Sequence, residues 1–273
     1  MQQKASALRS LQDSFGDIGR SSLRSSMDWS VSWWHVAKVG ALIMVLALSP
    51  STYNRENRVA VARHMVLGTL PALPWFALMS AVISVVLIRI VVVTAQSYGL
   101  SQYALEMVVR VLVLELIPLS AALFVALRCT VPSGAELIAM HARGAFDALQ
   151  RAGHDPLRHE LLPRVVAGMF AVLLLAAVSC LIALALAYFA VHGFSAGGFE
   201  KFTRTLGHIF NPAVTLIFAL KTLFFGFAVA LIPVAALLRG PHDPGSNPAL
   251  DTLVRLFAAT LLIEVASLVS NYY

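Results

Sequence analysis

Residues 165–191 form an apolar run without a single charged side chain, and this run constrains the fold more than any other part of the chain. A helix needs about 20 apolar residues to cross the hydrocarbon core of a bilayer, so the run is long enough to span a membrane. The composition agrees, because 59% of the 273 residues are hydrophobic and 12% are charged, with a mean hydropathy of +0.79. Soluble domains usually carry about a quarter charged residues. The chain is therefore expected to be an integral membrane protein.

Four more apolar runs meet the same length criterion. They are residues 66–94, 103–127, 212–238 and 250–269. The first begins near two prolines, Pro71 and Pro74, and the second is interrupted by charged residues. We therefore predict an all-α polytopic membrane protein with about five transmembrane helices.

The N-terminal region, residues 1–54, differs from the membrane domain predicted for residues 55–273. Its first 28 residues are polar, rich in Ser and Arg, and lack the early apolar core of a secretory signal. Either a weak amphipathic helix on the membrane surface or a solvated tail fits them. Residues 33–48 are apolar but short, and Trp33 and Trp34 at their start favour the headgroup layer. We predict an interfacial or half-inserted helix there; a sixth crossing, which would reverse the side of the N-terminus, is the alternative.

Lysine and arginine are distributed unevenly between the loops. Residues 1–65 hold eight of them, residues 128–164 hold five and residues 239–249 hold one, whereas the loops on the other face hold two, Lys201 and Arg204. Basic residues gather in cytoplasmic loops. The N-terminus and the loop at 128–164 are therefore predicted to be cytoplasmic, and the C-terminus to lie outside. The same bias accounts for much of the net charge of +6, so we do not expect nucleic-acid binding.

A short amphipathic helix is predicted in the cytoplasmic loop, at residues 138–152. Its apolar residues recur at spacings of three and four, as one face of a helix requires. They are Ile138, Ala142, Ala145, Leu149 and Ala152, with Phe146 beside them. Gly153 is predicted to end this helix. Such a helix either docks on a motor subunit or lies on lipid as an ordinary interfacial helix.

A second helix is predicted to begin directly after that stop. Asp155 is expected to cap it and Pro156 to take its first position. Pro163 is expected to bend it where it enters the long apolar run. The loop is therefore predicted to read as helix, sharp turn and new helix.

The chain has no GxxxxGK[ST] phosphate-binding motif. Its lysines are Lys4, Lys38, Lys201 and Lys221, and none of them follows the glycine pattern. The chain is therefore not expected to bind and split nucleotide by that mechanism. If its function is driven by ATP, a partner subunit must supply the hydrolysis.

Three segments carry a resemblance to a known family: LELIPLSAALFVALR (114–128), AELIAM (135–140) and DPLRHELLPRV (155–165). Together they resemble the MlaE/YrbE-type permeases, the transmembrane subunits of ABC transporters that work with MCE lipid-carrying proteins. The positions that match the family's pattern are Glu115, Pro118, Arg128, Glu136, Asp155, Pro156, Pro163 and Arg164. Lys221 also matches a lysine in the family's fourth span. The resemblance extends over roughly residues 55–270.

The resemblance implies a homodimeric permease in the bacterial inner membrane, with its C-terminus in the periplasm. ABC ATPase subunits would bind its cytoplasmic face and an MCE-domain protein its periplasmic face. The cargo would be a phospholipid or a related lipid, as in systems that maintain outer-membrane lipid asymmetry. ATP and Mg²⁺ would be bound by the ATPase, so the resemblance implies no cofactor, metal site or catalytic residue in this chain.

The resemblance also assigns roles to individual residues. Glu115 and Lys221 are expected to line the polar end of a lipid cavity and to pair when it is empty. Pro118, Arg128 and Glu136 are expected to be structural. Coupling to the ATPase is assigned to residues in and beside the loop helix, namely Ile138, Ala142, Phe146, Leu149, Asp155, Pro156 and Arg164.

The chain departs from the family's pattern at several positions. Leu114 stands where the family usually has arginine, and Ile117 where it usually has glycine. Gly144 and Ala145 replace a Glu-Gln pair in the coupling helix. The resemblance therefore implies a divergent member whose headgroup contacts and ATPase docking differ from the usual ones.

Other charged residues also interrupt the apolar runs. They are Arg89, Arg110, Arg255 and Glu264. A charge at the bilayer centre costs about 3 kcal/mol unless it is paired, hydrated or close to the interface. Interhelix ion pairs and snorkelling to the interface are the predicted solutions.

Two alternative functions, a hydrolase and a membrane scaffold, have weaker support in the sequence. Residues 193–197 match the G-x-S-x-G elbow of hydrolases, with Ser195 as nucleophile, but that elbow follows a strand and an apolar helix is predicted here. A membrane scaffold without transport activity would need no coupling helix.

His154 and His159 are five residues apart, which is not the spacing of a helical metal pair. Cys129 and Cys180 lie in different settings, and no disulfide is expected between them.

Overall fold

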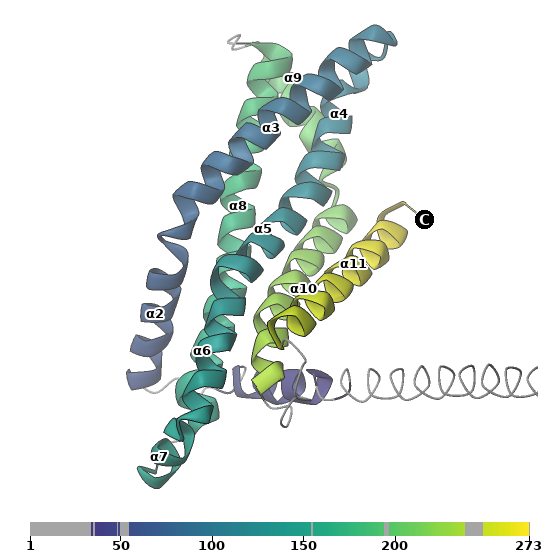
Figure 1. Ribbon diagram of the computed structural model, residues 1–273. Coiled ribbons are helices and arrows are strands. Elements are labelled where there is room, and N and C mark those ends of the chain that lie inside the picture. The colour runs from purple at the N-terminus through teal and green to yellow at the C-terminus, as the bar shows by residue number, and fades with distance from the viewer. Residues whose placement is uncertain are drawn as a thin grey trace, which may run out of the picture. The chain divides into compact units, whose positions relative to one another are not determined.

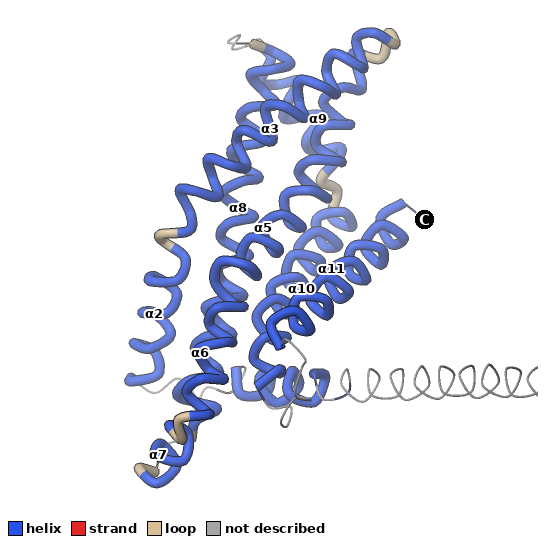
Figure 2. The backbone as a smooth tube through the Cα atoms, in the orientation of Figure 1, coloured by secondary structure: helices blue, strands red, loops and turns tan. Residues whose placement is uncertain are grey.

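The computed structural model describes residues 34, 36–47, 49, 55–153, 155–193, 197–237 and 248–272, and every element in these ranges is a helix (Figure 2). The chain divides into two compact units, Met1–Val45 and Leu46–Tyr273. The second unit holds the membrane-spanning helices. The fold class predicted from the sequence is thus confirmed.

The apolar helix Val36–Ala47 is the described part of the predicted interfacial segment 33–48. Its 12 residues extend about 18 Å at 1.5 Å per residue. A bilayer core is about 30 Å thick, so the described helix is too short to cross it. The interfacial position stays a prediction, since the flanking residues Trp33 and Leu48 lie outside the described ranges.

Within the described residues, five helices are long and apolar enough to cross a membrane, as predicted. They are Ala72–Ser97, Ser101–Ala142, Leu157–His192, Pro212–Ala236 and Leu250–Asn271. The start of the first was predicted incorrectly at residue 66. Residues 66–69 instead end a separate helix, α2 (Arg55–Thr69), and α3 (Ala72–Ser97) begins after Pro71. Proline lacks the N–H that a continuous helix would need there, which explains the break.

The second span is longer than the predicted range 103–127 and is built from six consecutive pieces. They are η2 (Ser101–Tyr103), α4 (Ala104–Val108), η3 (Val109–Leu116), α5 (Ile117–Val125), η4 (Ala126–Thr130) and α6 (Val131–Ala142). Both η3 and η4 are π-helical. The extra turns carry the helix beyond the apolar run and place Glu136 on the same continuous element as Glu115.

Three π-helical segments each end two residues before a proline. The pairs are η3 with Pro118, η4 with Pro132, and η5 (Leu157–Leu161) with Pro163. Proline has no N–H, and its ring clashes with the carbonyl four residues earlier in an α-helix. A π turn bonds five residues back and makes room for the ring. These helices therefore continue through prolines that would otherwise break them.

The predicted single helix at 138–152 is wrong: the chain forms two helices there. Helix α6 ends at Ala142, and α7 spans Ala145–Arg151. Gly144 lies between them with φ +70°, a left-handed conformation that closes α6. Gly144 is one of the residues that depart from the family's pattern, so this departure accounts for the break.

The turn after α7 follows the prediction. Gly153 has φ +80° and ends the helix. The backbone N–H of Leu157 donates to Asp155 Oδ1 over 3.0 Å, which is the expected cap. The new helix begins at Pro156. It continues through η5 into α8 (Leu162–His192).

Helix α8 forms the centre of the second unit and packs against α2, α3, α5 and α10 (Pro212–Leu237) (Figure 1). Small residues permit this close packing: a Cβ added to Gly168 would lie 3.0 Å from Ala230 Cβ. Helix α11 (Pro248–Tyr272) packs on α10. In this unit α7 lies at one end and α9 (Gly198–Ile209) at the other.

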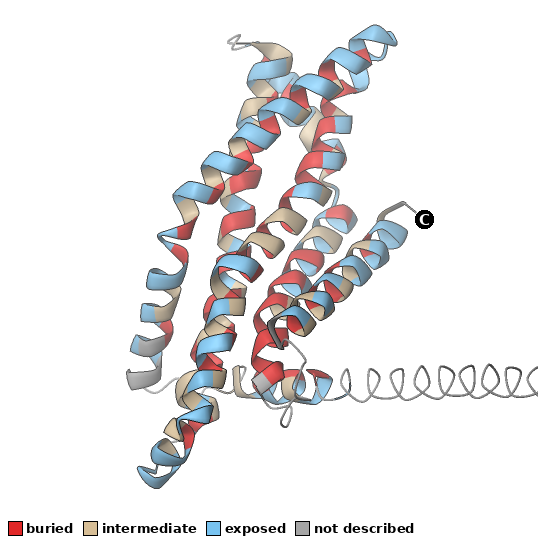
Figure 3. Cartoon of the chain, viewed as in Figure 1, coloured by how far each residue is buried: buried red, intermediate tan, exposed pale blue. Residues whose placement is uncertain are grey.

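Buried residues face the inside of this unit and exposed residues lie on its outside (Figure 3). Many of the exposed side chains are large and apolar. Trp75 on α3 and Leu262 on α11 are each 71% exposed. An aqueous surface would not tolerate so much exposed apolar area, whereas a lipid environment does. The burial pattern is that of a multi-pass membrane protein.

Candidate functional site

A buried ion cluster joins three of the spans. Lys221 on α10 forms ion pairs with Glu115 in η3 and with Glu264 on α11, the latter over 2.9 Å from Nζ to Oε2. The three side chains are 2%, 13% and 13% exposed. One cation faces two carboxylates, so the cluster carries a formal charge of −1 when all three groups are ionised.

Two further contacts hold the ammonium group of Lys221. Its Nζ donates to the backbone carbonyl of Leu114 over 3.3 Å. The same atom lies 5.8 Å from the ring centroid of Phe225, within the range of a cation–π interaction. The ammonium therefore contacts two carboxylates, one backbone carbonyl and one aromatic ring.

The expected pairing of Glu115 with Lys221 is present, whereas the third member of the cluster was missed. Glu264 was recognised only as a charge inside an apolar run. The sequence did contain a hint of its partner. A charge inside the membrane must be paired, and Lys221 is the one lysine in the five predicted spans. The role of Glu115 and Lys221 in lipid binding stays a prediction.

The departures at Leu114 and Ile117 lie next to this cluster. Both side chains are 2% exposed and belong to a hydrophobic core in which the second span packs with α3, α8, α9 and α10. They therefore fill the interior on the side where the family usually has an arginine and a glycine. The cluster consequently contains Lys221 as its one described cation.

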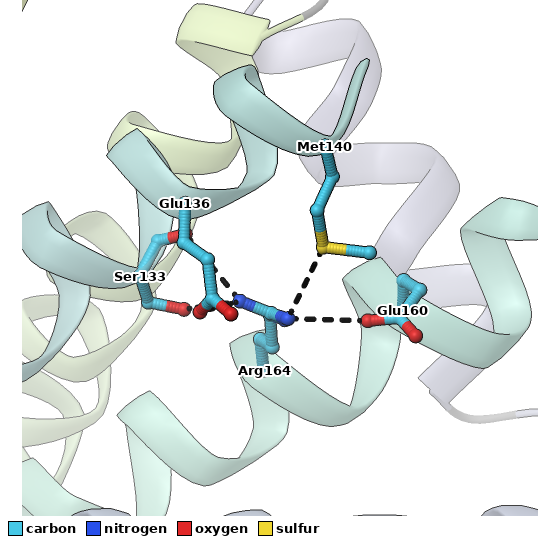
Figure 4. Close-up of polar contacts among 5 residues, drawn as sticks. All are labelled: Ser133, Glu136, Met140, Glu160 and Arg164. Atoms are coloured by element: carbon cyan, nitrogen blue, oxygen red, sulfur yellow. Dashed lines mark hydrogen bonds and ion pairs between the residues drawn. The ribbon is translucent and has the colours of Figure 1, made fainter. Parts of the chain in front are cut away.

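A second cluster is centred on Arg164, at the start of α8 (Figure 4). Its Nη1 donates to Glu136 Oε2 over 2.8 Å and to Ser133 Oγ over 3.2 Å, both on α6. Its Nη2 donates to Glu160 Oε2 over 3.2 Å and lies 3.7 Å from the sulfur of Met140. Arg164 therefore links α6 to α8. The chain between these two helices, which contains α7, is called the α7 excursion below.

Two positions of the family pattern, Glu136 and Arg164, are thus brought together across 28 residues of sequence. Pro118 is buried at the start of α5, after η3. Arg128 lies in η4 with an exposed side chain. The structural role expected for Pro118, Arg128 and Glu136 stays a prediction beyond these placements.

The residues assigned to coupling surround the α7 excursion. Phe146 is buried, and its ring centroid lies 5.5 Å from that of His141. Ile138 and Leu149 are half-buried, whereas Ala142 is exposed. The predicted apolar stripe is therefore divided between two helices, and contact with an ATPase stays a prediction.

A cavity of about 470 Å³ lies between α2, α6, α8 and α10. Its lining includes Arg128, Cys129, Glu136, Arg164 and His64. Burial of the His64 side chain lowers its pKa below the usual value, and the nearby Arg164 guanidinium lowers the pKa further. Neither Glu115 nor Lys221 lines this cavity.

The other charged residues predicted within the spans do not belong to either cluster. Arg110 pairs with Glu106, and Arg255 with Asp251, each over 2.9 Å and one turn apart on the same chain segment. Arg89 is exposed on α3. Each of these two pairs lies within one span, whereas Glu264 forms the predicted kind of interhelix pair with Lys221.

The alternative sites gain no geometric support. The G-x-S-x-G segment follows helix α8, where a hydrolase elbow would follow a strand, and Ser195 lies outside the described residues. His154 also lies outside them. Cys129 and Cys180 are free thiols, as expected.

Comparison with known proteins places these features in a family. A search of curated proteins finds no match. Residues 61–266, about three quarters of the chain, match the sequence profile of the family described as Permease MlaE. This range contains both ion clusters, the cavity and the α7 excursion. The chain therefore belongs to the MlaE permease family.

Proposed function

We propose that this protein is the permease subunit of an ABC transporter that moves phospholipid between the inner membrane and an MCE-protein carrier. Membership of the MlaE permease family supports a membrane permease. The chain has no GxxxxGK[ST] motif, which supports our proposal that a partner subunit hydrolyses the ATP. The working unit is a homodimer with two ATPase subunits on one face and an MCE assembly on the other.

The observation that carries this proposal is the continuity of the second span. Residues Ser101–Ala142 form one helix, which holds Glu115 in its first half and leads toward α7 at its end. From Glu115 to Ala142 this helix extends about 40 Å at 1.5 Å per residue. A displacement of α7 by a partner would therefore pass through the turn at Gly144 into this helix and so reach the buried Lys221 cluster.

The distribution of basic residues supports an assignment of the two sides of the membrane. The segment 128–164, which was predicted as a loop, holds five of them, and both α7 and the Arg164 cluster belong to it. Because such loops remain in the cytoplasm, we place α7 on the cytoplasmic face, where an ATPase binds. Helix α9 then lies at the periplasmic end with the MCE protein, and the C-terminus is periplasmic.

Lys221 gives the proposed transport path its selectivity for lipid headgroups. A phospholipid phosphate competes with Glu115 and Glu264 for the ammonium group, so lipid entry and ion pairing exclude each other. ATP then drives transport only if the two states of the permease bind lipid with different affinities, because equal binding would shift no population. Movement of the second span, which carries Glu115, supplies that difference.

Coupling is tested by changing the turn that follows α7. Asp155→Ala removes the side-chain acceptor for the Leu157 N–H, whereas Asp155→Asn keeps a good capping residue. In vesicles that contain the ATPase and the MCE protein, Asp155→Ala and Leu149→Ala are expected to hydrolyse ATP with less lipid moved per ATP. Asp155→Asn is expected to behave as wild type. If both alanine variants moved as much lipid per ATP as wild type, this segment would be a simple connector and the proposed coupling role would be contradicted.

Recovery of partners separates a transporter from a membrane scaffold. Affinity purification of the full chain from its native membrane is expected to recover an ATP-binding subunit. The complex should hydrolyse ATP, and the purified chain alone should not. Absence of any ATPase from the purified assembly would contradict the proposal.

A further inference from the structure

The cavity between α2, α6, α8 and α10 lies at the ends of the spans. Ala72 is the first residue of its span, and Val234 lies two residues from the end of another; both line the cavity. Arg164 stands near the start of a third span. Since the ends of membrane-spanning helices lie at the level of the lipid headgroups, these residues place one side of the cavity in that layer.

Small side chains on α8 create the space. Ala167, Gly168 and Ala171 follow Arg164 at spacings of three, four and seven, so all four residues lie on one face of the helix and line the cavity. Gly168 has no room for a larger side chain, because its added Cβ would lie 3.0 Å from both Ala230 Cβ and Thr130 Cγ2. The wall beside Arg164 is thus apolar and closely packed.

The two arginines of the cavity differ in their partners. Glu136 and Glu160 neutralise Arg164, whose side chain is mostly buried. In contrast, no carboxylate within the described ranges lies at ion-pair distance from Arg128, which lies within η4 and is exposed. Arg128 therefore brings an uncompensated positive charge to a cavity whose acidic residue, Glu136, already pairs with Arg164.

We infer that this cavity binds a phosphate group, with the Arg128 guanidinium as its ligand and the small-residue face of α8 as its apolar wall. A guanidinium donates two parallel hydrogen bonds to phosphate oxygens, which a single cationic point charge cannot do. A volume of about 470 Å³ falls within the range of small-molecule sites. The site is separate from the Lys221 cluster, so the protein holds two places for a headgroup.

The phosphate can come from a phospholipid headgroup or from free phosphate in solution. Both offer the same oxygens to Arg128. The headgroup source rests on the proposed function, because a lipid permease meets phospholipid at this level of the membrane. The inferred phosphate site does not depend on the proposed transport function, because binding of phosphate to it can be measured without ATP.

Cys129 supplies a native reporter of occupancy. It is the residue after Arg128, it lines the cavity, and its thiol is half-buried and hydrogen-bonded to the Gly68 carbonyl over 3.6 Å. The other thiol, Cys180, is buried within the third span. Peptide mass spectrometry distinguishes the two, so N-ethylmaleimide labelling of Cys129 in the full chain measures access to the cavity.

The experiment measures this labelling rate in dodecylmaltoside, a detergent without phosphate. Dioleoyl phosphatidylglycerol at about ten times its dissociation constant should slow Cys129 labelling about tenfold, as mass action requires. A galactolipid with the same two oleoyl chains should not slow it. Inorganic phosphate forms the third arm: equal protection by it also supports the site and assigns the ligand to free phosphate.

Variants make the result specific to Arg128. Arg128→Gln should lose the protection and Arg128→Lys should keep part of it, while Arg58→Gln, which removes an exposed charge from α2 outside the cavity, should keep all of it. Equal protection by both lipids, or full protection in Arg128→Gln, would overturn the inference. Because no ATP is present, that failure would leave the proposed transport function standing.

Discussion

The two ion clusters have the same formal composition, one cation with two carboxylates, but they lie in different surroundings. In the Lys221 cluster all three side chains are shielded inside the membrane domain. In the other, Arg164 is 9% exposed while Glu136 and Glu160 are 61% and 26% exposed. Water can therefore solvate the second set of carboxylates and not the first. The ion pairs of the Lys221 cluster are consequently required to neutralise buried charges, whereas those of the Arg164 cluster can be replaced by contacts with water.

The largest expected effect comes from removing the cation of the shielded cluster. Lys221→Met would leave Glu115 and Glu264 buried without a counter-charge, which should lower the free energy of unfolding by about 3–5 kcal/mol. Unfolding in mixed micelles, followed by circular dichroism, measures this loss. The triple variant Lys221→Met, Glu115→Gln, Glu264→Gln has no buried charge and should recover most of the stability. Wild-type stability in the single variant would show that the cluster does not depend on its ion pairs.

The corresponding change in the solvated cluster should cost less. Arg164→Met breaks hydrogen bonds to Glu136 and Glu160, but both carboxylates can turn to water, so a loss of about 1–3 kcal/mol is expected in the same assay. Arg158→Met is the matched control. Its pair with Asp155 is 3.7 Å long and half-exposed, and such pairs contribute at most about 1 kcal/mol. A larger loss for Arg164→Met than for Lys221→Met would reverse the comparison.

Packing beside the Arg164 cluster should matter about as much as its charges. Gly168→Ala places a methyl group 3.0 Å from Ala230 Cβ and should destabilise the protein by about 1–3 kcal/mol through overpacking. Gly207→Ala on α9 meets nothing within 4 Å and should instead stabilise by about 0.5–1 kcal/mol. Thermal unfolding of the two variants compares them. A gain of stability in both would mean that α8 and α10 can move apart at no cost.

The smallest effect should be a pH dependence from His64, which faces the Arg164 cluster. Burial and the positive charge of Arg164 lower the pKa of His64 in the folded protein below its usual 6.5. The unfolded chain therefore takes up a proton first as the pH falls, so the contribution of His64 is complete above pH 6.5 and is lost as the pH falls toward the folded pKa. His64→Gln should remove this part of the pH dependence of stability. An unchanged pH profile in the variant would contradict it.

The sequence predicted best what local patterns determine. The charge-free run at 165–191 predicted the central span, and Gly153 with Asp155 predicted a stop and a cap that the structure contains. Gly144 could have predicted the end of α6, but the apolar stripe that continues across it favoured one helix. The π segments have a signal as well, since each precedes a proline.

Contacts between distant segments were harder to predict. Glu264 approaches Lys221 because α10 and α11 pack side by side in one particular register, and nothing in either segment alone specifies that register. The pair Glu136 and Arg164 was visible only as two positions of a family pattern. The cavity was not predicted, because it arises from small residues on α8 facing an opening between helices from four parts of the chain.

ATP-driven lipid transfer is the most direct test of the central claim. Vesicles would contain the full chain with its ATPase, and an MCE-domain protein would accept or supply a fluorescent phospholipid. We expect transfer to require both ATP and this chain, and to fall strongly in Glu115→Gln, which keeps the shape of the side chain and weakens the hold on Lys221, while ATPase binding is retained. Equal transfer with the wild type, with Glu115→Gln and without the chain would contradict the account.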